Sequence, residues 1–195
     1  MDKYYISTAN SRQSTNWSGG ETTWDSLRRR LSKVHRTSET FAAYQEMTKE
    51  QRGRIKDIGG FVAARLNGPR RKAEAVVSRS LLTFDIDDAT DWSVWETLGL
   101  LGYTACMYTT HSHEPERPRY RIVMPLSREC TPDEYQAVAR RIASIIDEGL
   151  LQVDHTTYEA SRPMYWPSAS SDGEFISDRY DGQDVDVDVV LSEYV

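Results

Sequence analysis

Two aspartates separated by a single residue, Asp85 and Asp87, end an apolar run in the segment SRSLLTFDIDDAT, residues 78–90. We predict a strand over residues 81–87, in which successive side chains alternate between the two faces. Asp85 and Asp87 would then project from one face, whereas Asp88 would lie on the other face or in the turn. Two carboxylates this close repel each other and are costly to bury, so the pair predicts a cation between them. Metal-dependent phosphoryl chemistry uses such oxygen ligands, and they suit Mg²⁺ or Mn²⁺.

Two histidines and two arginines lie close together in the segment YTTHSHEPERPRYRIVMPL, residues 108–126. His111 and His113 follow the end of a hydroxyl-rich strand, and alternation in the next strand places Arg119 and Arg121 on one face. Arginines donate charge-assisted hydrogen bonds to phosphate, so this arrangement predicts a site for a triphosphate. The alternative is a solvated hairpin whose arginines pair with the two glutamates of the loop.

A third carboxylate and a further arginine occur in QVDHTTYEASRPMYWPS, residues 152–168. Asp154 would complete the metal-ligand set, and Arg162 would anchor a phosphate or hold an aspartate in place. Asp186 and Asp188 also alternate, but with valine and without such neighbours. We interpret that pair as part of an exposed edge strand that aids solubility.

Hydrophobic spacing and capping residues predict the elements that must hold these side chains. Asp91 is a predicted N-cap, and Thr131 with Glu134 forms a capping box. No internal repeat or flexible linker divides the 195 residues, so we expect one α+β domain. The predicted strands are 3–9, 61–66, 73–80, 81–87, 103–110 and 119–127, and the predicted helices are 24–34, 39–47, 49–57, 91–102 and 132–149.

Charge is divided unevenly along a chain whose net charge is −6. Residues 27–72 hold 13 Lys or Arg against 4 Asp or Glu, and residues 147–195 hold 12 acidic residues and 2 arginines. The basic half could therefore face a polyanion, although a solvated basic helix face would have the same composition. Within it we expect contacts with a polyanion from Lys56 and from the Asn67-Gly68 hairpin turn, which carries Arg70, Arg71 and Lys72.

Several classes of protein are disfavoured by composition. The chain has no apolar run of membrane-spanning length and its first residues lack a signal peptide, so we expect a cytoplasmic protein without a membrane partner. Two cysteines, Cys106 and Cys130, provide neither a disulfide framework nor a cysteine zinc site. A phosphatase of the haloacid dehalogenase type also begins with a strand-borne Asp-x-Asp. That class needs a later lysine, and none follows Lys72.

The order of these motifs resembles the archaeo-eukaryotic primase superfamily, in which a strand-borne Asp-x-Asp is followed by a histidine at a strand end and by a late aspartate. More narrowly, ETFAAYQEMTKEQRGRIKDIGGFV, SRSLLTFDID, YTTHSHEPERPRYRIVMPLSR and SRPMYWPS resemble the primase-polymerase domain of phage and mobile-element replication proteins. The resemblance implies that Asp85, Asp87 and Asp154 bind metal and that His111 contacts the phosphates of an incoming nucleotide. In many family members the histidine leads the next strand, so His113, Arg119 and Arg121 are alternatives for that role.

The fold implied by the resemblance is an RRM-like palm, an antiparallel or mixed sheet backed by helices, over residues 79–195. A small αβ unit would occupy residues 1–78. The implied activity is that of a DNA primase and polymerase that uses NTPs or dNTPs with two Mg²⁺ or Mn²⁺ ions. The implied partners are a single-stranded DNA template, a primer and a replicative helicase domain or subunit. The nucleic-acid backbone would be contacted by Lys56, Arg70, Arg71 and Lys72. The protein would act as a monomer in the cytoplasm of a bacterial host, as a domain of a longer protein or by itself. A non-catalytic single-strand or origin-binding module and a metal-dependent nuclease are the alternatives.

Overall fold

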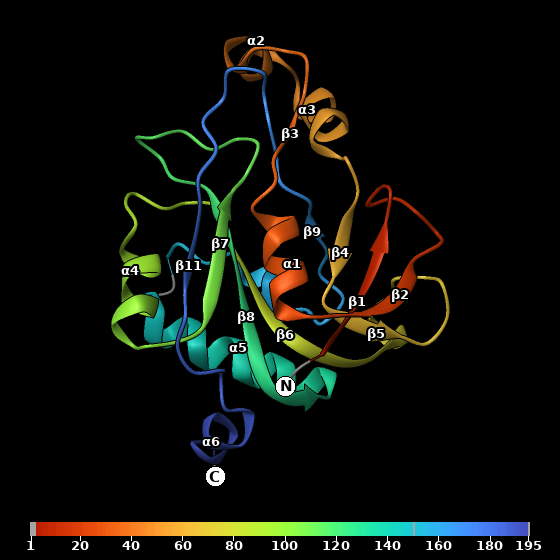
Figure 1. Cartoon of the computed structure of the whole chain (residues 1–195), viewed down its shortest axis with the longest axis vertical. Helices are drawn as coiled ribbons and strands as arrows, with labels where there is room; N and C mark the ends of the chain where they lie inside the picture. Colours follow the sequence, from red (N-terminus) through yellow and green to blue (C-terminus); the bar gives the residue numbers. More distant parts are fainter. Residues whose placement is uncertain (1–2, 150, 195) are drawn as a thin grey trace.

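An antiparallel sheet of five strands forms the centre of the computed structural model, which describes residues 3–149 and 151–194. Its strand order is β11-β7-β8-β6-β5, and the two long central strands β6 and β8 pair along most of their length (Figure 1). The bounds of these strands are Ala64–Leu66 (β5), Val76–Ile86 (β6), Ala105–Thr109 (β7), Tyr120–Cys130 (β8) and Ser177–Tyr180 (β11).

Two helices cover one face of this sheet, α4 (Ser93–Leu100) and α5 (Pro132–Ile146). Leu82, Phe84 and Ile86 of β6 point into the core that these helices share. The chain order β6-α4-β7-β8-α5 therefore builds a palm-like sheet backed by helices, which confirms the predicted α+β fold. Side-chain alternation along β6 positions the other set, including Thr83 and Asp85, on the opposite face.

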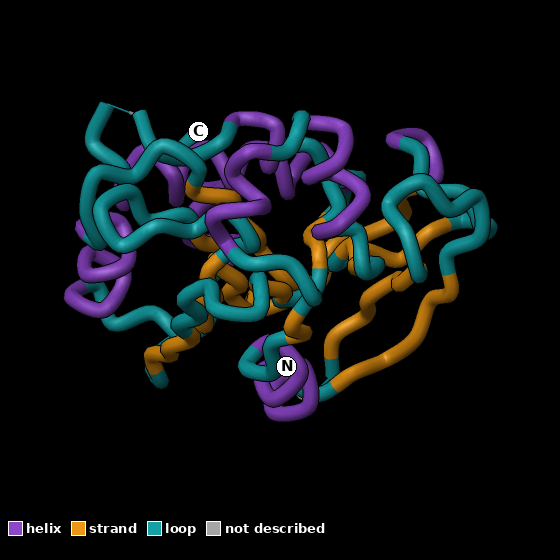
Figure 2. The backbone as a smooth tube through the Cα atoms, turned by 90° about the horizontal axis from the view of Figure 1, so that it is seen from above, coloured by secondary structure: helices purple, strands orange, loops and turns teal. Residues whose placement is uncertain are grey.

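The opposite face is covered by α1 (Trp24–Leu31) and by a second sheet of order β2-β1-β4-β9. Leu27 and Leu31 of α1 pack with Leu81 and Tyr108 of the central sheet in one buried cluster. Seen from above, helical segments lie on both sides of the central strands (Figure 2). The strands of the second sheet are Tyr4–Ala9 (β1), Ser18–Thr22 (β2), Gly60–Val62 (β4) and Met164–Tyr165 (β9).

The segment after α5 returns to the N-terminal half of the chain. Its strands β9 and β10 (Ser168–Ala169) pair with β4 and with β3 (His35–Arg36). Strand β6 runs across the boundary that we expected, between residues 78 and 79, to separate the N-terminal αβ unit from the palm-like core. The division of the chain into these two parts stays a prediction. The remaining elements are α2 (Phe41–Glu46), α3 (Lys49–Lys56), α6 (Val187–Ser192) and two short 3₁₀ helices, η1 (Ala73–Ala75) and η2 (His155–Tyr158).

Several predicted boundaries are wrong for identifiable reasons. The predicted strand 61–66 is split, because β4 pairs with β1 and β9 in one sheet whereas β5 pairs with β6 in the other. The predicted strands 73–80 and 81–87 are largely one continuous strand, β6. The last predicted helix ends at Ile146 instead of residue 149. Strand β2 was not predicted, since its sequence SGGET is polar and fully or partly exposed.

Two predictions about aspartates also need correction. Asp91 lies one residue before the N-cap, which is Trp92, although its Oδ1 accepts a hydrogen bond from the backbone N–H of Ser93 at 2.9 Å. Asp186 is the N-cap of α6 instead of an edge-strand residue, and Asp188 in the first turn forms an ion pair with Arg128 at 2.7 Å.

Among the helices within residues 3–149 and 151–194, none has the length and apolar composition needed to cross a bilayer.

Candidate metal and nucleotide site

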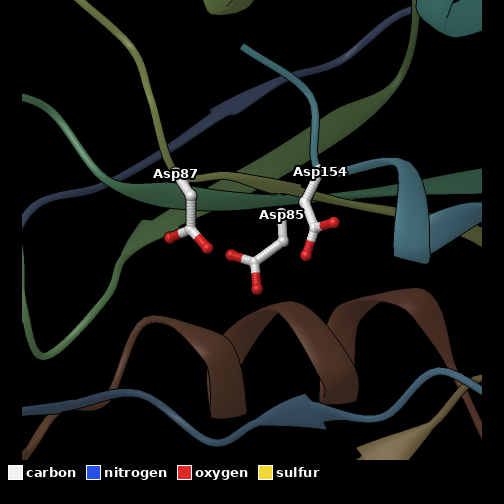
Figure 3. Close-up of side chains that lie close together, drawn as sticks. All are labelled: Asp85, Asp87 and Asp154. Carbon is white, nitrogen blue, oxygen red and sulfur yellow. The ribbon is translucent and has the colours of Figure 1, made fainter. Parts of the chain in front are cut away.

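Three carboxylates converge at one end of β6. Asp85 is the penultimate residue of that strand, Asp87 follows it directly, and Asp154 is the N-cap of η2. The backbone N–H of Asp154 donates to the carbonyl oxygen of Asp85 at 2.8 Å, which fixes the two segments against each other. One oxygen from each carboxylate lies within 4.8 Å of the others, and the three side chains point toward the same space (Figure 3). The exposed neighbour Asp88 is not part of this group.

The electrostatics of the three carboxylates fit a divalent cation. Asp85 is buried, and its Oδ1 has no hydrogen-bond partner among the described residues. Burial and the neighbouring charge of Asp85 raise the pKa of Asp87. An unpartnered buried oxygen and mutual repulsion are costly, and a bound cation removes both costs. Oxygen ligands in this number suit Mg²⁺ or Mn²⁺.

Each of the three carboxylates also faces an arginine. Arg121 Nη2 lies 3.2 Å from Asp85 Oδ2, and Arg162 Nη2 lies 3.0 Å from Asp154 Oδ2. Arg119 Nη1 is more distant from Asp87 Oδ1, at 3.9 Å. Arg119 and Arg121 therefore face the aspartates, and the alternative in which they pair with the loop glutamates is wrong. All three arginines line the pocket described next.

A pocket of about 150 Å³ adjoins Asp85 and Asp87. Hydroxyl groups of Thr110, Ser112 and Ser168 line part of its wall. A small polar pocket with this excess of positive charge suits a phosphate-rich ligand better than an apolar one. Its cationic lining residues are Arg12, Lys56, Arg119, Arg121 and Arg162.

The two histidines of the THSH segment lie in different surroundings. His111 lines the pocket, but its Nδ1 lies 2.9 Å from Ser168 Oγ and its Nε2 lies 3.0 Å from Glu39 Oε1. His113 lies outside the lining of this pocket, where its Nε2 lies 2.8 Å from Glu174 Oε2 and its Nδ1 accepts from the backbone N–H of Arg119. Both ring nitrogens of each histidine are thus already engaged.

The basic residues expected to bind nucleic acid are dispersed. Lys56 lines the pocket, where burial and the charge of Arg121 lower its pKa. Arg71 is partly buried and donates through Nη1 to the carbonyl oxygen of Ser161 at 2.9 Å. Arg70 and Lys72 are exposed on the hairpin turn.

Two residues near this site, Arg12 and Glu39, were not identified from sequence. Arg12 comes from a polar loop after β1, and no periodicity or motif there indicates a site. Glu39 precedes α2, and its distance from His111 in the sequence hides their contact in space. The quoted segment SRPMYWPS does include Ser168 and Tyr165, and both line the pocket.

The fold and the site define a class of protein through comparison with known structures. The AEP domain of the cyanophage S-2L primase-polymerase aligns over 98% of this chain and 88% of that chain, with a TM-score of 0.50 and 13% sequence identity. At this identity the likeness concerns the fold alone, and it confirms the archaeo-eukaryotic primase fold implied by the motifs. The family model of the VapE N-terminal domain matches residues 2–195, and the chain belongs to that family. A comparison with curated proteins found no match.

Proposed function

We propose that this chain is a DNA primase-polymerase domain that performs metal-dependent, template-directed nucleotidyl transfer in phage or mobile-element replication. The observation that carries the proposal is the convergence of Asp85, Asp87 and Asp154 beside a pocket lined by cationic side chains. The primase-type fold is consistent with this chemistry.

In the proposed reaction, the 3′-hydroxyl oxygen of a primer or first nucleotide forms a bond to the α-phosphorus of an incoming NTP or dNTP. The bond from that phosphorus to the oxygen bridging to the β-phosphate breaks, the hydroxyl proton passes to water, and pyrophosphate leaves. Asp85, Asp87 and Asp154 would hold divalent ions. When bound, these ions supply activation of the attacking oxygen and neutralisation of the leaving group.

The arginines divide into two roles by their contacts. Arg121 is buried against Asp85, and Arg162 is bonded to Asp154, so we assign these two to holding the carboxylates. Arg119 has one long contact and a side chain that is 33% exposed, which leaves it available to the triphosphate. Lys56 and Arg12 line the same pocket and would share that task. His111 would act by orienting Ser168 in the pocket wall.

The proposed partners are a single-stranded DNA template and a primer. A replicative helicase, as another domain of the same protein or as a separate subunit, would supply the opened template. We propose that the domain itself acts as a monomer.

An extension assay tests the proposal. The wild-type protein is supplied with single-stranded template, with and without primer, with NTPs or dNTPs, and with Mg²⁺ or Mn²⁺. The Asp85→Ala/Asp87→Ala variant is measured beside it. We expect labelled product from the wild type and loss of product by at least about a thousandfold in the variant.

The other candidate classes give different results in the same assay. Shortening of labelled DNA without nucleotide addition would indicate a nuclease. DNA binding without product in either protein would indicate a binding module. Undiminished product from the double variant would contradict the assignment of the carboxylates.

A further inference from the structure

Helix α3 is unusual in its composition and burial. It spans Lys49–Lys56 with the sequence KEQRGRIK, and none of its residues, all of which the structure describes, is buried. Helices of this length draw most of their stability from packing an apolar face. Four of the eight residues of α3 are basic, and contacts with the core explain little of why this helix is present. It lies beside α2 at the top of the molecule in Figure 1.

One side of α3 forms the wall of an open groove of about 660 Å³. The opposite wall is the loop Ser11–Gln13, which follows β1. Lys49 and Gly53 line the groove at a spacing of four residues, which places them along one face of the helix, and the C-cap residue Asp57 lines the same groove.

The groove adjoins the pocket beside the three aspartates. Arg12, which is exposed, lines both cavities, so they lie on either side of this residue. Lys56, in the last turn of α3, lines the catalytic pocket. Asp57 fixes this junction, because its carboxylate accepts from Ser11 Oγ at 2.6 Å and from the backbone N–H of Arg12 at 2.9 Å.

Gly53 leaves open space on the groove side of α3. It lines the groove, and an added Cβ at this position would meet no described atom within 4 Å. A glycine inside a helix is destabilising relative to alanine, but without a Cβ it allows a ligand to approach the backbone closely. The groove is therefore accessible to a ligand beside the backbone of α3.

The charge of the groove favours an anion. The carboxylate of Asp57 is already committed to the loop, and Glu50 forms an ion pair with Arg54 at 2.6 Å. Lys49 and Arg12 are both exposed, and both line the groove. A phosphate backbone entering the groove would meet Lys49 and Arg12, and it would compete with Glu50 for Arg54.

We propose that this groove binds single-stranded nucleic acid by its sugar-phosphate backbone and leads the strand past Arg12 to the catalytic pocket. The role of the pocket at the end of that path rests on the proposed function, whereas the binding itself does not. Gly53 gives the strand room beside the helix backbone, and the flanking cations neutralise its phosphates.

Anisotropy of a fluorescent oligodeoxythymidine, measured in EDTA without nucleotides, tests the proposal. We expect Gly53→Leu to weaken binding by about tenfold while the thermal midpoint stays equal or rises, since leucine favours a helix more than glycine does. Lys49→Ala should lower the slope of log K against log salt by about one, as loss of one phosphate contact requires.

Glu50→Gln is expected to increase affinity, and misfolding would not produce such an increase. It frees Arg54 from its ion pair, so the variant should bind the oligonucleotide about threefold more tightly. Arg29→Ala is the matched control, because Arg29 is an exposed arginine on α1 and lines a different cavity. It should change affinity and slope by less than the Lys49 variant does.

The outcomes separate this proposal from the proposed function. If wild type and Gly53→Leu bound the oligonucleotide with equal affinity, or if Glu50→Gln bound it more weakly, the proposal that the groove binds nucleic acid would be wrong. A larger loss of affinity in Arg29→Ala than in Lys49→Ala would also contradict the proposal and would indicate that the strand binds on α1. The groove variants could change affinity for the oligonucleotide while the wild-type protein shows no polymerising activity. That result would support nucleic-acid binding in the groove and reject the proposed function.

Discussion

The protonation state of His111 follows from its two neighbours. Burial lowers the pKa of His111, so the ring is neutral near pH 7. Burial alone would raise the pKa of Glu39, but hydrogen bonds, led by that from Thr37, keep it below its usual value and keep the carboxylate charged. The His111 Nε2–H therefore donates to Glu39, and Nδ1 accepts from the Ser168 hydroxyl. The Ser168 oxygen is then left as an acceptor at the pocket wall.

This chain of hydrogen bonds predicts the effect of Glu39→Gln. The charge of Glu39 raises the pKa of His111 and partly offsets the effect of burial. Removing that charge should lower the pKa of His111 further, which an NMR titration of the ring measures. Glu174→Gln beside His113 is the control and should leave the His111 titration in place. A rise in the His111 pKa in the Glu39 variant would show that the charge of Glu39 does not stabilise the protonated ring.

The buried pair of Asp85 and Arg121 makes a second prediction at the scale of single residues. Their side chains are 7% and 9% exposed. Arg121→Met leaves Asp85 buried without its partner, so we expect a loss of about 3 kcal/mol in the free energy of unfolding without metal. Urea denaturation in EDTA measures this loss. The double variant Asp85→Asn/Arg121→Met should lose less than the sum of the two single variants, and strict additivity would show that the pair is not coupled.

At the scale of elements, one cluster of charges joins β8, α5 and α6. Glu134 closes the capping box of α5 with Thr131 and also accepts from Arg128 of β8, which contacts Asp188 of α6. Hydrogen bonds from Arg128 and from the Thr131 backbone lower the pKa of Glu134 from 4.5 to about 2. Because the folded-state pKa is the lower one, this stabilisation is complete above about pH 4.5 and is lost as pH falls toward 2.

Replacing Glu134 with Gln keeps the capping geometry and removes the charge. We expect Glu134→Gln to cost about 1 kcal/mol at pH 7, since the cluster is partly exposed to solvent. The difference from wild type should shrink as the pH falls below 4.5, which urea denaturation over a pH series measures. A constant difference across the series would contradict the role of the charge.

Sequence patterns predicted elements well where the information is local. The capping box at Thr131 and the alternation through Asp85 are both local, and both occur as predicted. The run over residues 61–66 indicated a strand, but its division between two sheets depends on partners far away in the chain. The alternation of valine and aspartate near Asp186 is equally compatible with a capped helix turn. Arg12 lies in a loop, where no period exists to indicate which side chains face a site.

At the scale of the whole molecule, the candidate site lies where the two sheets meet. Of the three candidate metal-binding carboxylates, Asp85 lies in β6, Asp87 directly follows that strand, and Asp154 is the N-cap of η2. Tyr165 and Ser168, which line the pocket, belong to β9 and β10 and pair with strands of the N-terminal half. The position of that pocket wall therefore depends on how closely β9 approaches β4.

Gly60 allows β9 to lie close to β4. A Cβ at Gly60 would clash with the carbonyl oxygen of Met164 in β9, so Gly60→Ala must push the two strands apart. We expect a loss of about 2 kcal/mol in the free energy of unfolding, as for other overpacked sites. Nucleotide binding should weaken as well, because Tyr165 and Ser168 move with β9. Urea denaturation and nucleotide titration measure the two effects.

Gly20→Ala is the matched control for this substitution. Gly20 lies in β2 of the same sheet, and a Cβ there would meet no described atom within 4 Å. The control should change the free energy of unfolding by less than about 0.5 kcal/mol. If both variants were equally stable and bound nucleotide equally well, the contact between β4 and β9 would not position the pocket wall. A selective loss in Gly60→Ala would instead show that the N-terminal half shapes the site as much as the palm sheet does.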